Sequence, residues 1–283
     1  MIAALIAALS NGVSLVTDKV TLSKKKTPLK LYIATLFIFL FVFTVIFYPK
    51  YGRVDWVLAL MPNFMFLLLL LVIVSIIQNI FYYDSIQKEP ISQHEMIMMS
   101  QPLVTILMAS AFFPETFDLK IFILSIVASV SLMVGKLEKR HITFTRTSYN
   151  LILAVVLIAI QNIISKELLY IYSPVALYAI RVFFLAIFFM IYYRPVYSML
   201  KENNRFWYIG LSAAFAAVYM IASLYSFDKV GIVYTTLIST LTPIVVFLAS
   251  WEILHERIKT RLVFASIIIL ICSVWATFLQ FYQ

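Results

Sequence analysis

Long apolar stretches, separated by short polar segments, run along the whole chain of 283 residues. A helix needs roughly 20 mainly apolar residues to cross a hydrocarbon core of about 30 Å. Because these runs are continuous rather than alternating, they predict membrane-spanning helices and not the strands of a barrel. The fold class is therefore an all-α polytopic membrane protein with ten transmembrane helices. The predicted spans cover residues 1–17, 30–48, 56–82, 96–113, 119–135, 148–165, 174–193, 205–227, 232–251 and 262–281.

The second half of the chain repeats the first. Residues around Pro102 recur around Pro243 at a constant offset. Further matching residues lie upstream, where the two halves differ slightly in length. The matches are Lys88 with Lys229, Ile91 with Ile232, Pro102 with Pro243, Glu115 with Glu256, Lys120 with Arg261, Thr27-Pro28 with Ser173-Pro174, and Ser10-Asn11 with Gln161-Asn162. We predict a first repeat at 1–140 (helices 1–5) and a second at 141–283 (helices 6–10). Five spans is an odd number, so the copies cross the membrane in opposite directions, an arrangement typical of secondary transporters.

Composition excludes an ordinary soluble domain, with 63% hydrophobic and 12% charged residues and a mean hydropathy of +0.99. The net charge of +9 is compatible with nucleic-acid binding, but most of the 22 lysines and arginines flank the predicted spans. The loops after odd-numbered spans hold most of them, including the Lys24-Lys25-Lys26 run. By the positive-inside rule these loops are cytoplasmic and both termini lie outside. We predict a multi-pass protein of the cell (plasma or inner) membrane that contacts the lipid bilayer and no nucleic acid.

Acidic residues give no indication of proton coupling. All 13 Asp and Glu residues fall in predicted loops or at span margins, and Asp18, Glu95, Glu167 and Glu252 are nearest the hydrocarbon. We interpret each of these four as interfacial, so a coupling ion, uniport and exchange all stay open. The sequence has no phosphate-binding loop and no H-E-x-x-H motif, and it has a single cysteine. We therefore predict no enzymatic activity, catalytic residue, metal site or cofactor.

Arg181 is the basic residue that lies deepest inside a predicted span, whereas Lys30, Lys120 and Arg205 lie within two residues of a span end. It follows the start of that span at Pro174 by about two helical turns. A cation at that depth is costly unless it reaches the interface or faces a polar cavity. Two interpretations stay open: Arg181 lines a substrate pathway and binds an anionic group, or it extends to the interface and pairs with an acid or with helix carbonyls.

Polar residues within other spans are candidates for a cavity wall. Asn11 and Asn162 lie in the middle of equivalent spans, where either helix packing or a cavity explains them. Ser239 lies on a hydroxyl-rich helix face with Thr235 and Thr242. The candidate substrate-binding residues are Asn11, Asn79, Gln101, Asn162, Arg181, Tyr219 and Ser239. Pro102 and Pro243 lie inside predicted spans, where we expect them to kink the helices.

The second repeat contains Tyr225-Ser226-Phe227-Asp228-Lys229, Leu241-Thr242-Pro243-Ile244 and Leu254-His255-Glu256-Arg257; the first contains Tyr82-Tyr83-Asp84-Ser85-Ile86, Gln101-Pro102-Leu103 and Pro114-Glu115. In order and spacing these segments resemble the drug/metabolite transporter superfamily, in its ten-helix branch with two EamA-type repeats. Arg181 is similar to an arginine often found there. The Ser10-Asn11-Gly12 segment departs from a Trp-Gly pair of many relatives, and the embedded glutamate of the four-helix members is missing.

The resemblance implies a basket of ten helices around a central cavity formed by both repeats. It implies a secondary transporter, driven without ATP, that exports or exchanges a small organic metabolite such as an amino acid by alternating access. A flippase of a lipid-linked sugar and a non-transporting membrane scaffold or sensor are the alternatives. A small-molecule solute, with or without a coupling ion, is the expected partner.

Overall fold

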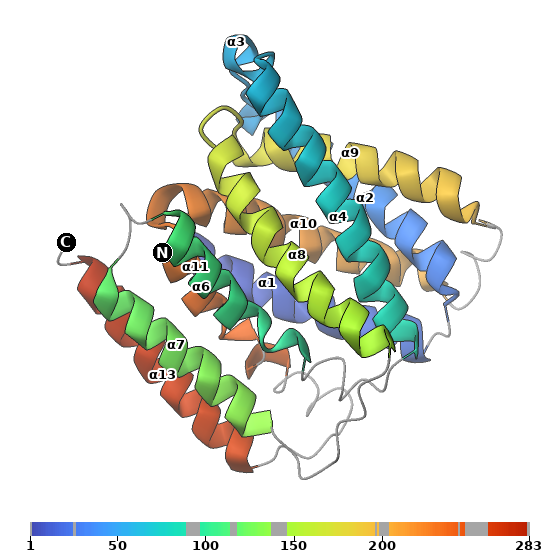
Figure 1. Ribbon diagram of the computed structural model, residues 1–283. Coiled ribbons are helices and arrows are strands. Elements are labelled where there is room, and N and C mark those ends of the chain that lie inside the picture. Colours follow the sequence, from blue (N-terminus) through green and yellow to red (C-terminus); the bar gives the residue numbers. More distant parts are fainter. Residues whose placement is uncertain are drawn as a thin grey trace.

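The computed structural model describes residues 2–24, 27–88, 97–113, 118–136, 146–195, 197, 204–242, 244–246 and 260–281. These residues form helices, a short π-helical turn η1 (Val20–Lys24) and connecting segments (Figure 1). The helices are α1 (Ile2–Lys19), α2 (Leu29–Tyr51), α3 (Trp56–Ala59), α4 (Pro62–Lys88), α6 (Gln101–Phe112), α7 (Leu119–Lys136), α8 (Arg146–Leu168), α9 (Pro174–Tyr193), α10 (Arg205–Val230), α11 (Ile232–Ser239) and α13 (Thr260–Phe281).

Ten of these helices are apolar, and they match the ten predicted spans. Within the described residues, six helical segments are long and apolar enough to cross a membrane, and four further apolar segments are shorter. The short ones include α6 and α11, the fourth helices of the two repeats. Large apolar side chains stay exposed on the outer helices, for example Phe264, Ile271 and Val274 of α13. Such surfaces face lipid, and the predicted all-α polytopic fold is confirmed.

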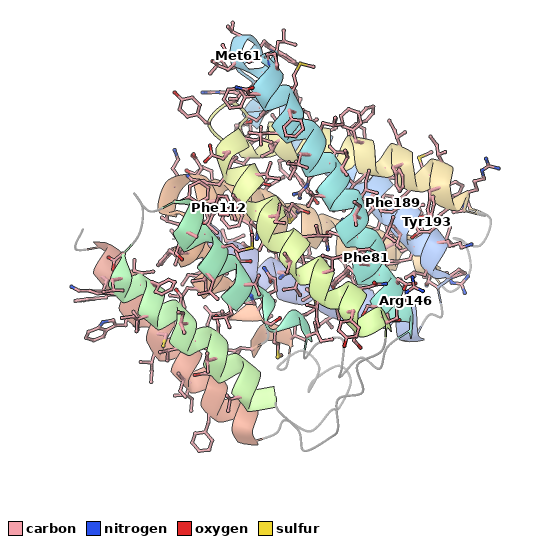
Figure 2. All side chains as sticks on the ribbon, viewed as in Figure 1. Met61, Phe81, Phe112, Arg146, Phe189 and Tyr193 are labelled. Atoms are coloured by element: carbon pink, nitrogen blue, oxygen red, sulfur yellow. The ribbon has the colours of Figure 1, made fainter. Side chains whose placement is uncertain are left out.

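Helix packing follows a two-fold pattern. The first helix of each repeat packs along the third helix of the other, as α1 with α10 and α4 with α8. The second helices pack together as α2 with α9, the fourth as α6 with α11, and the fifth as α7 with α13. In Figure 2, Met61 precedes α4 at one end of the molecule and Arg146 begins α8 at the opposite end. Helices α4 and α8 therefore run antiparallel, side by side.

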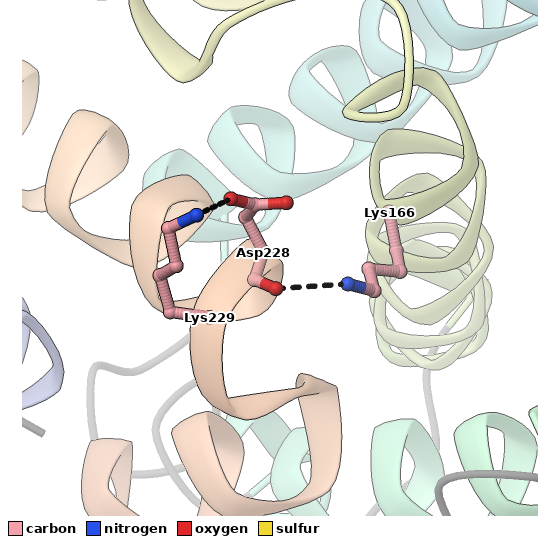
Figure 3. A network of polar contacts seen from close by, with 3 residues as sticks. All are labelled: Lys166, Asp228 and Lys229. Carbon is pink, nitrogen blue, oxygen red and sulfur yellow. Dashed lines mark hydrogen bonds and ion pairs between the residues drawn. The ribbon is translucent and has the colours of Figure 1, made fainter.

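One loop contact shows that the repeats are inverted. The segment after α2 pairs with the segment after α8, where Val54 bridges to Tyr172 and the N–H of Ser173 donates to the Arg53 carbonyl at 2.9 Å. These segments end the second helix of one repeat and the first helix of the other. They can share a face only if the repeats run in opposite directions. Within the second repeat, the Lys166 amine near the end of α8 donates to the Asp228 carbonyl of α10 at 3.3 Å (Figure 3).

Aromatic packing holds the second helices together. Phe37 of α2 stacks on Phe189 of α9 with ring centroids 5.0 Å apart, and Phe189 stacks on Tyr193 at 5.6 Å (Figure 2). Phe189 is fully buried. Stacked aromatic pairs add about 0.5–1.5 kcal/mol beyond the area that they bury. The α2–α9 pair is thus a rigid wall against which the cavity is built.

Both fourth helices break at the same aligned position, and this corrects the expected role of Pro102. The N–H of Ser100 donates to the Ile97 carbonyl at 3.0 Å, and the aligned N–H of Leu241 donates to Ile238 at 3.0 Å. These tight turns precede the prolines. Pro102 lies in the first turn of α6 and not in a helix interior. Proline has no backbone N–H, and the first turn of a helix is the place where that N–H is not needed for a hydrogen bond within the helix. Pro243 lies outside the described residues.

Candidate functional site

A cavity of about 750 Å³ lies between the two repeats. Side chains from α1, α2, α4, α6, α8, α9, α10 and α11 form its wall. All seven residues that the sequence nominated lie on this wall, together with Pro102: Asn11, Asn79, Gln101, Asn162, Arg181, Tyr219 and Ser239. Helix α2, which the sequence did not nominate, contributes Leu36, Phe37 and Leu40.

Arg181 combines deep burial with few protein partners. Its side chain is 5% exposed, and its guanidinium carbon lies 5.0 Å from the centroid of the Tyr178 ring. A cation over an aromatic face is stabilised by the ring quadrupole. Tyr219 of α10 is the other phenol within electrostatic range. Among the described residues, Arg181 has no ion pair and no hydrogen bond. Its five N–H donors are thus available to the cavity.

Three amide side chains on the wall form no hydrogen bond with the described residues: Asn11, Gln78 and Asn162. Asn11 and Asn162 are half-buried, and neither forms a hydrogen bond within the part of the chain that the structure describes. Asn79 differs, because its side-chain N–H donates to the Ser75 carbonyl at 2.7 Å. Gln101 donates to the Thr105 hydroxyl at a long 3.4 Å. The asparagine pair, like Gln78, therefore has hydrogen-bonding capacity to offer a bound molecule.

The hydroxyls of α11 are mostly engaged by the protein. Ser239 donates to the Thr235 carbonyl at 2.9 Å, although its side chain lies on the cavity wall. Thr235 shares a 2.7 Å hydrogen bond with Ser226 of α10, and Thr242 donates to the Ala8 carbonyl of α1 at 3.2 Å. Thr235 and Thr242 thus fasten helices to one another, while Ser239 keeps lone pairs directed at the cavity.

Asp18 is the residue of the wall that sequence analysis misjudged. We interpreted it as interfacial, but α1 runs to Lys19 and η1 continues the helical path, so Asp18 lies within the first span. Its carboxylate accepts hydrogen bonds from the hydroxyls of Tyr32 and Ser212. The signal was present in the sequence, because Asn11, Ser14 and Asp18 recur at helical spacing and share one face.

Two polar contacts join the repeats beside the cavity. Ser75 of α4 donates to the Gln161 side chain of α8 at 3.0 Å. Ser14 of α1 and Ser212 of α10 approach to 3.3 Å between hydroxyl oxygens. These helix pairs are related by the two-fold pattern, and the α1–α10 seam carries in addition the hydrogen bond from Ser212 to Asp18. Serines suit such seams because small side chains allow close helix approach.

Inverted repeats, ten apolar helices and a polar-lined cavity between the halves define a polytopic membrane protein of the secondary-transporter architecture. The profile of the EamA-like transporter family matches residues 1–134 and again 147–278, and the chain belongs to this family. It is accordingly a membrane transporter of the drug/metabolite type. The resemblance stated from the sequence, with two EamA repeats, is confirmed.

The fold recurs in a solved structure described as "Crystal structure of protein", which is 14% identical to this chain. The similarity covers 98% of this chain and 96% of that one, with a TM-score of 0.71. At this identity the likeness shows the fold alone. A comparison with curated proteins finds no match.

Proposed function

We propose that this protein is a secondary transporter that exports or exchanges a small organic metabolite with an anionic group, such as an amino acid, by alternating access. Arg181 supports this proposal most directly. A guanidinium in a cavity wall, held on an aromatic ring and without an acidic partner in the described part of the chain, is suited to bind a carboxylate. A planar fork of donors matches two carboxylate oxygens at once.

The remaining candidates have complementary roles in the proposal. The amides of Asn11 and Asn162 donate and accept hydrogen bonds to the polar body of the solute. Asn79, Gln101, Tyr219 and Ser239 complete the polar wall. Pro102 sets where α6 starts after the break, and we expect Pro243 to have the corresponding role in the second repeat.

Alternating access requires the repeats to move as two bodies. Each of the α1–α10 and α4–α8 seams carries a side-chain hydrogen bond between serine and a polar partner, which is a weak tie. Such bonds between membrane helices contribute on average about 0.6 kcal/mol. Rocking of one repeat against the other therefore breaks few strong contacts at the α4–α8 seam, whereas the α1–α10 seam also has to release the hydrogen bond between Ser212 and Asp18; the cavity then opens to each side in turn.

The surrounding membrane and the orientation belong to the same proposal. The basic loops after odd-numbered spans support a cytoplasmic position for those loops and an outside position for both termini. A cysteine added at either end and labelled with a membrane-impermeant maleimide in intact cells tests this. Labelling only after the cells are opened would place the termini inside.

The first test is ligand binding to the detergent-purified protein. Thermal unfolding is recorded with single amino acids, nucleotides, nucleotide sugars and common anions. A ligand that binds only the folded state stabilises it by about 2.7 kcal/mol at a hundredfold excess over its dissociation constant. We expect a stabilising hit among compounds with a carboxylate. Stabilisation only by lipid-linked sugars would favour a flippase instead.

The second test is counterflow in proteoliposomes, in which unlabelled solute inside drives labelled solute inward. We expect Arg181→Gln to lower counterflow of the hit at least tenfold without lowering folded yield. Arg194→Gln is the matched control, because Arg194 is exposed at the end of the same helix. Equal counterflow in wild type and Arg181→Gln would remove Arg181 from the proposed site.

A further inference from the structure

Asp18 is a carboxylate on the cavity wall whose described hydrogen-bond partners are neutral. Its hydrogen-bond donors, the hydroxyls of Tyr32 and Ser212, both reach the same oxygen, Oδ1. Among the described residues, no group donates to Oδ2 and no lysine or arginine forms an ion pair with Asp18. The side chain is only partly exposed, and it lines the cavity. Oδ2 is therefore the position at which a proton can be carried.

Among the described residues, the groups that face Asp18 from the neighbouring helices are uncharged. Helix α2 presents Tyr32, and α10 presents Ser212, next to Ser14 of α1. Helix α4 presents Tyr83, whose ring meets that of Tyr32 edge-on at 6.2 Å. A carboxylate in such surroundings is neutralised by a proton or a cation rather than by the protein. Both donors direct an O–H group at Oδ1. This arrangement stabilises an ionised carboxylate, and it does not offer the oxygen lone pairs that a metal ion needs.

The hydrogen bond between Asp18 and Ser212 crosses from one repeat to the other. Asp18 belongs to α1 and Ser212 to α10, and these helices pack along each other. An ionised carboxylate accepts this bond more strongly than a neutral carboxyl group does. Protonation therefore weakens a tie across a seam that has to move during transport. The π-helical turn η1, a type of backbone frequent at functional sites, begins two residues after Asp18.

We infer that Asp18 is the proton site of this transporter, through which solute movement is coupled to proton movement. The inference rests on the proposed transport function. Oδ2 takes a proton from water on one side of the membrane and returns it to water on the other. The ionised form holds the Ser212 bond and the corresponding arrangement of the repeats, whereas the protonated form releases it. Solute and proton thereby bias the same two-state equilibrium.

The first test detects the proton and needs no solute. Infrared spectra of the full chain in lipid are recorded over a pH series, and the carbonyl stretch of protonated carboxyl groups is followed. We expect a titrating band in wild type that is missing in Asp18→Asn. Asp55→Asn is the matched control, because Asp55 is exposed and caps α3 outside the cavity. An unchanged titration in Asp18→Asn overturns the inference.

Milder variants keep the test decisive if Asp18→Asn folds poorly. Tyr32→Phe and Ser212→Ala each remove one donor to the ionised carboxylate while keeping Asp18. Hydrogen bonds to a charged form favour that form, so their loss moves the midpoint of the band to higher pH. A midpoint that is the same in wild type and both variants would show that the titrating carboxyl is a different one.

The second test separates coupling from transport. Labelled amino acids are offered to proteoliposomes, first as counterflow at equal pH and then as accumulation driven by a pH gradient. We expect Asp18→Asn to lose gradient-driven accumulation at least tenfold, and Asp55→Asn to keep it. Counterflow in wild type without any accumulation under the pH gradient overturns the coupling and leaves the transport function standing. Absence of counterflow for every solute overturns the transport function, and the infrared titration then decides the proton site.

Discussion

Tyr32 and Tyr178 occupy equivalent positions in the two repeats, but one contacts an acidic side chain and the other a basic side chain. The hydroxyl of Tyr32 donates to the Asp18 carboxylate, whereas the ring of Tyr178 lies 5.0 Å from the Arg181 guanidinium carbon. The position equivalent to Arg181 in the first repeat is Thr35, and Asp18 has an apolar counterpart in the second. The repeats thus share a backbone frame but carry different charges. This asymmetry gives the two halves of the cavity distinct chemistry.

Arg181→Lys tests whether the planar guanidinium matters beyond its charge. Lysine keeps a positive charge but loses both the bidentate fork and the stacking on Tyr178. We expect the KM for counterflow of a carboxylate solute to rise about tenfold, which corresponds to the roughly 1.4 kcal/mol that one strong polar contact provides. Counterflow kinetics over a range of solute concentrations measure this. A lysine variant with the wild-type KM would show that a point charge is sufficient.

Thr35→Val is expected to stabilise the protein. The Thr35 side chain is 3% exposed, and its hydroxyl is buried with no hydrogen bond to any described residue. An unsatisfied buried hydroxyl costs about 1–3 kcal/mol, and valine has the same shape without it. Thr44→Val in the same helix is the control, because the Thr44 hydroxyl donates to the Leu40 carbonyl at 2.7 Å. Thermal unfolding in detergent should show a gain for Thr35→Val only. A loss at position 35 would reveal a partner for that hydroxyl.

The positions of the helices and the repeat were predictable because each is a property of many residues together and not of a single one. A membrane span needs many apolar residues in a row, so single polar residues do not hide it. Arg181 stood out for the same reason, as a lone cation in an apolar run. The spacing of Asn11, Ser14 and Asp18 indicated one polar helix face, but the hydrogen bond of Asp18 with Ser212, which is 194 residues away in the sequence, was not predictable. Hydropathy averages do not resolve a helix end, nor which neighbour a carboxylate meets.

The prolines illustrate the same limit at the level of one residue. Proline in an apolar run predicts a kink, but the chain breaks two residues earlier, at Ser100 before α6 and at Leu241 after α11. Whether a proline kinks a helix or starts one depends on the hydrogen bonds of the preceding turn. Those bonds are set by packing between the repeats, so the sequence indicates the irregularity and not its form.

Ser173→Ala is expected to loosen the loop contact that joins the inverted repeats. The Ser173 hydroxyl donates to the Tyr51 carbonyl at 2.8 Å and accepts from the Arg53 N–H at 2.9 Å. It also caps α9 by accepting from the Ala176 N–H at 3.3 Å. Loss of a capping serine costs about 0.5–2 kcal/mol, and we expect the upper part of that range.

Thermal unfolding of Ser173→Ala in detergent measures this cost. Ser110→Ala is the control, because the Ser110 hydroxyl makes only a local bond to the Leu107 carbonyl at 2.9 Å. Faster hydrogen exchange at the Asp55 N–H, which donates to the Ile171 carbonyl across the same contact, is the second readout. Equal stability of the two variants would mean that the loop contact is held by its backbone alone.

Gly12→Ala is expected to force apart two helices that meet beside the cavity. A Cβ at Gly12 would lie 2.7 Å from Cγ1 and 2.8 Å from Cβ of Val245. Rotation of the valine side chain relieves only the first contact, because its Cβ is fixed by the backbone. Helix α1 would therefore move away from the segment after α11, where Thr242 donates to the Ala8 carbonyl. Overpacking of this kind costs about 1–3 kcal/mol.

Gly210→Ala provides the matched control for this prediction. A Cβ at Gly210 would lie 3.8 Å from Cε2 of Phe39, an ordinary contact, so we expect no loss of stability there. Alanine is also the better helix former by about 1 kcal/mol. Melting temperatures in detergent should thus fall for Gly12→Ala and hold or rise for Gly210→Ala. If both variants melt like the wild type, then α1 lies farther from the segment after α11 than in the structure. The cavity would then be wider on this side.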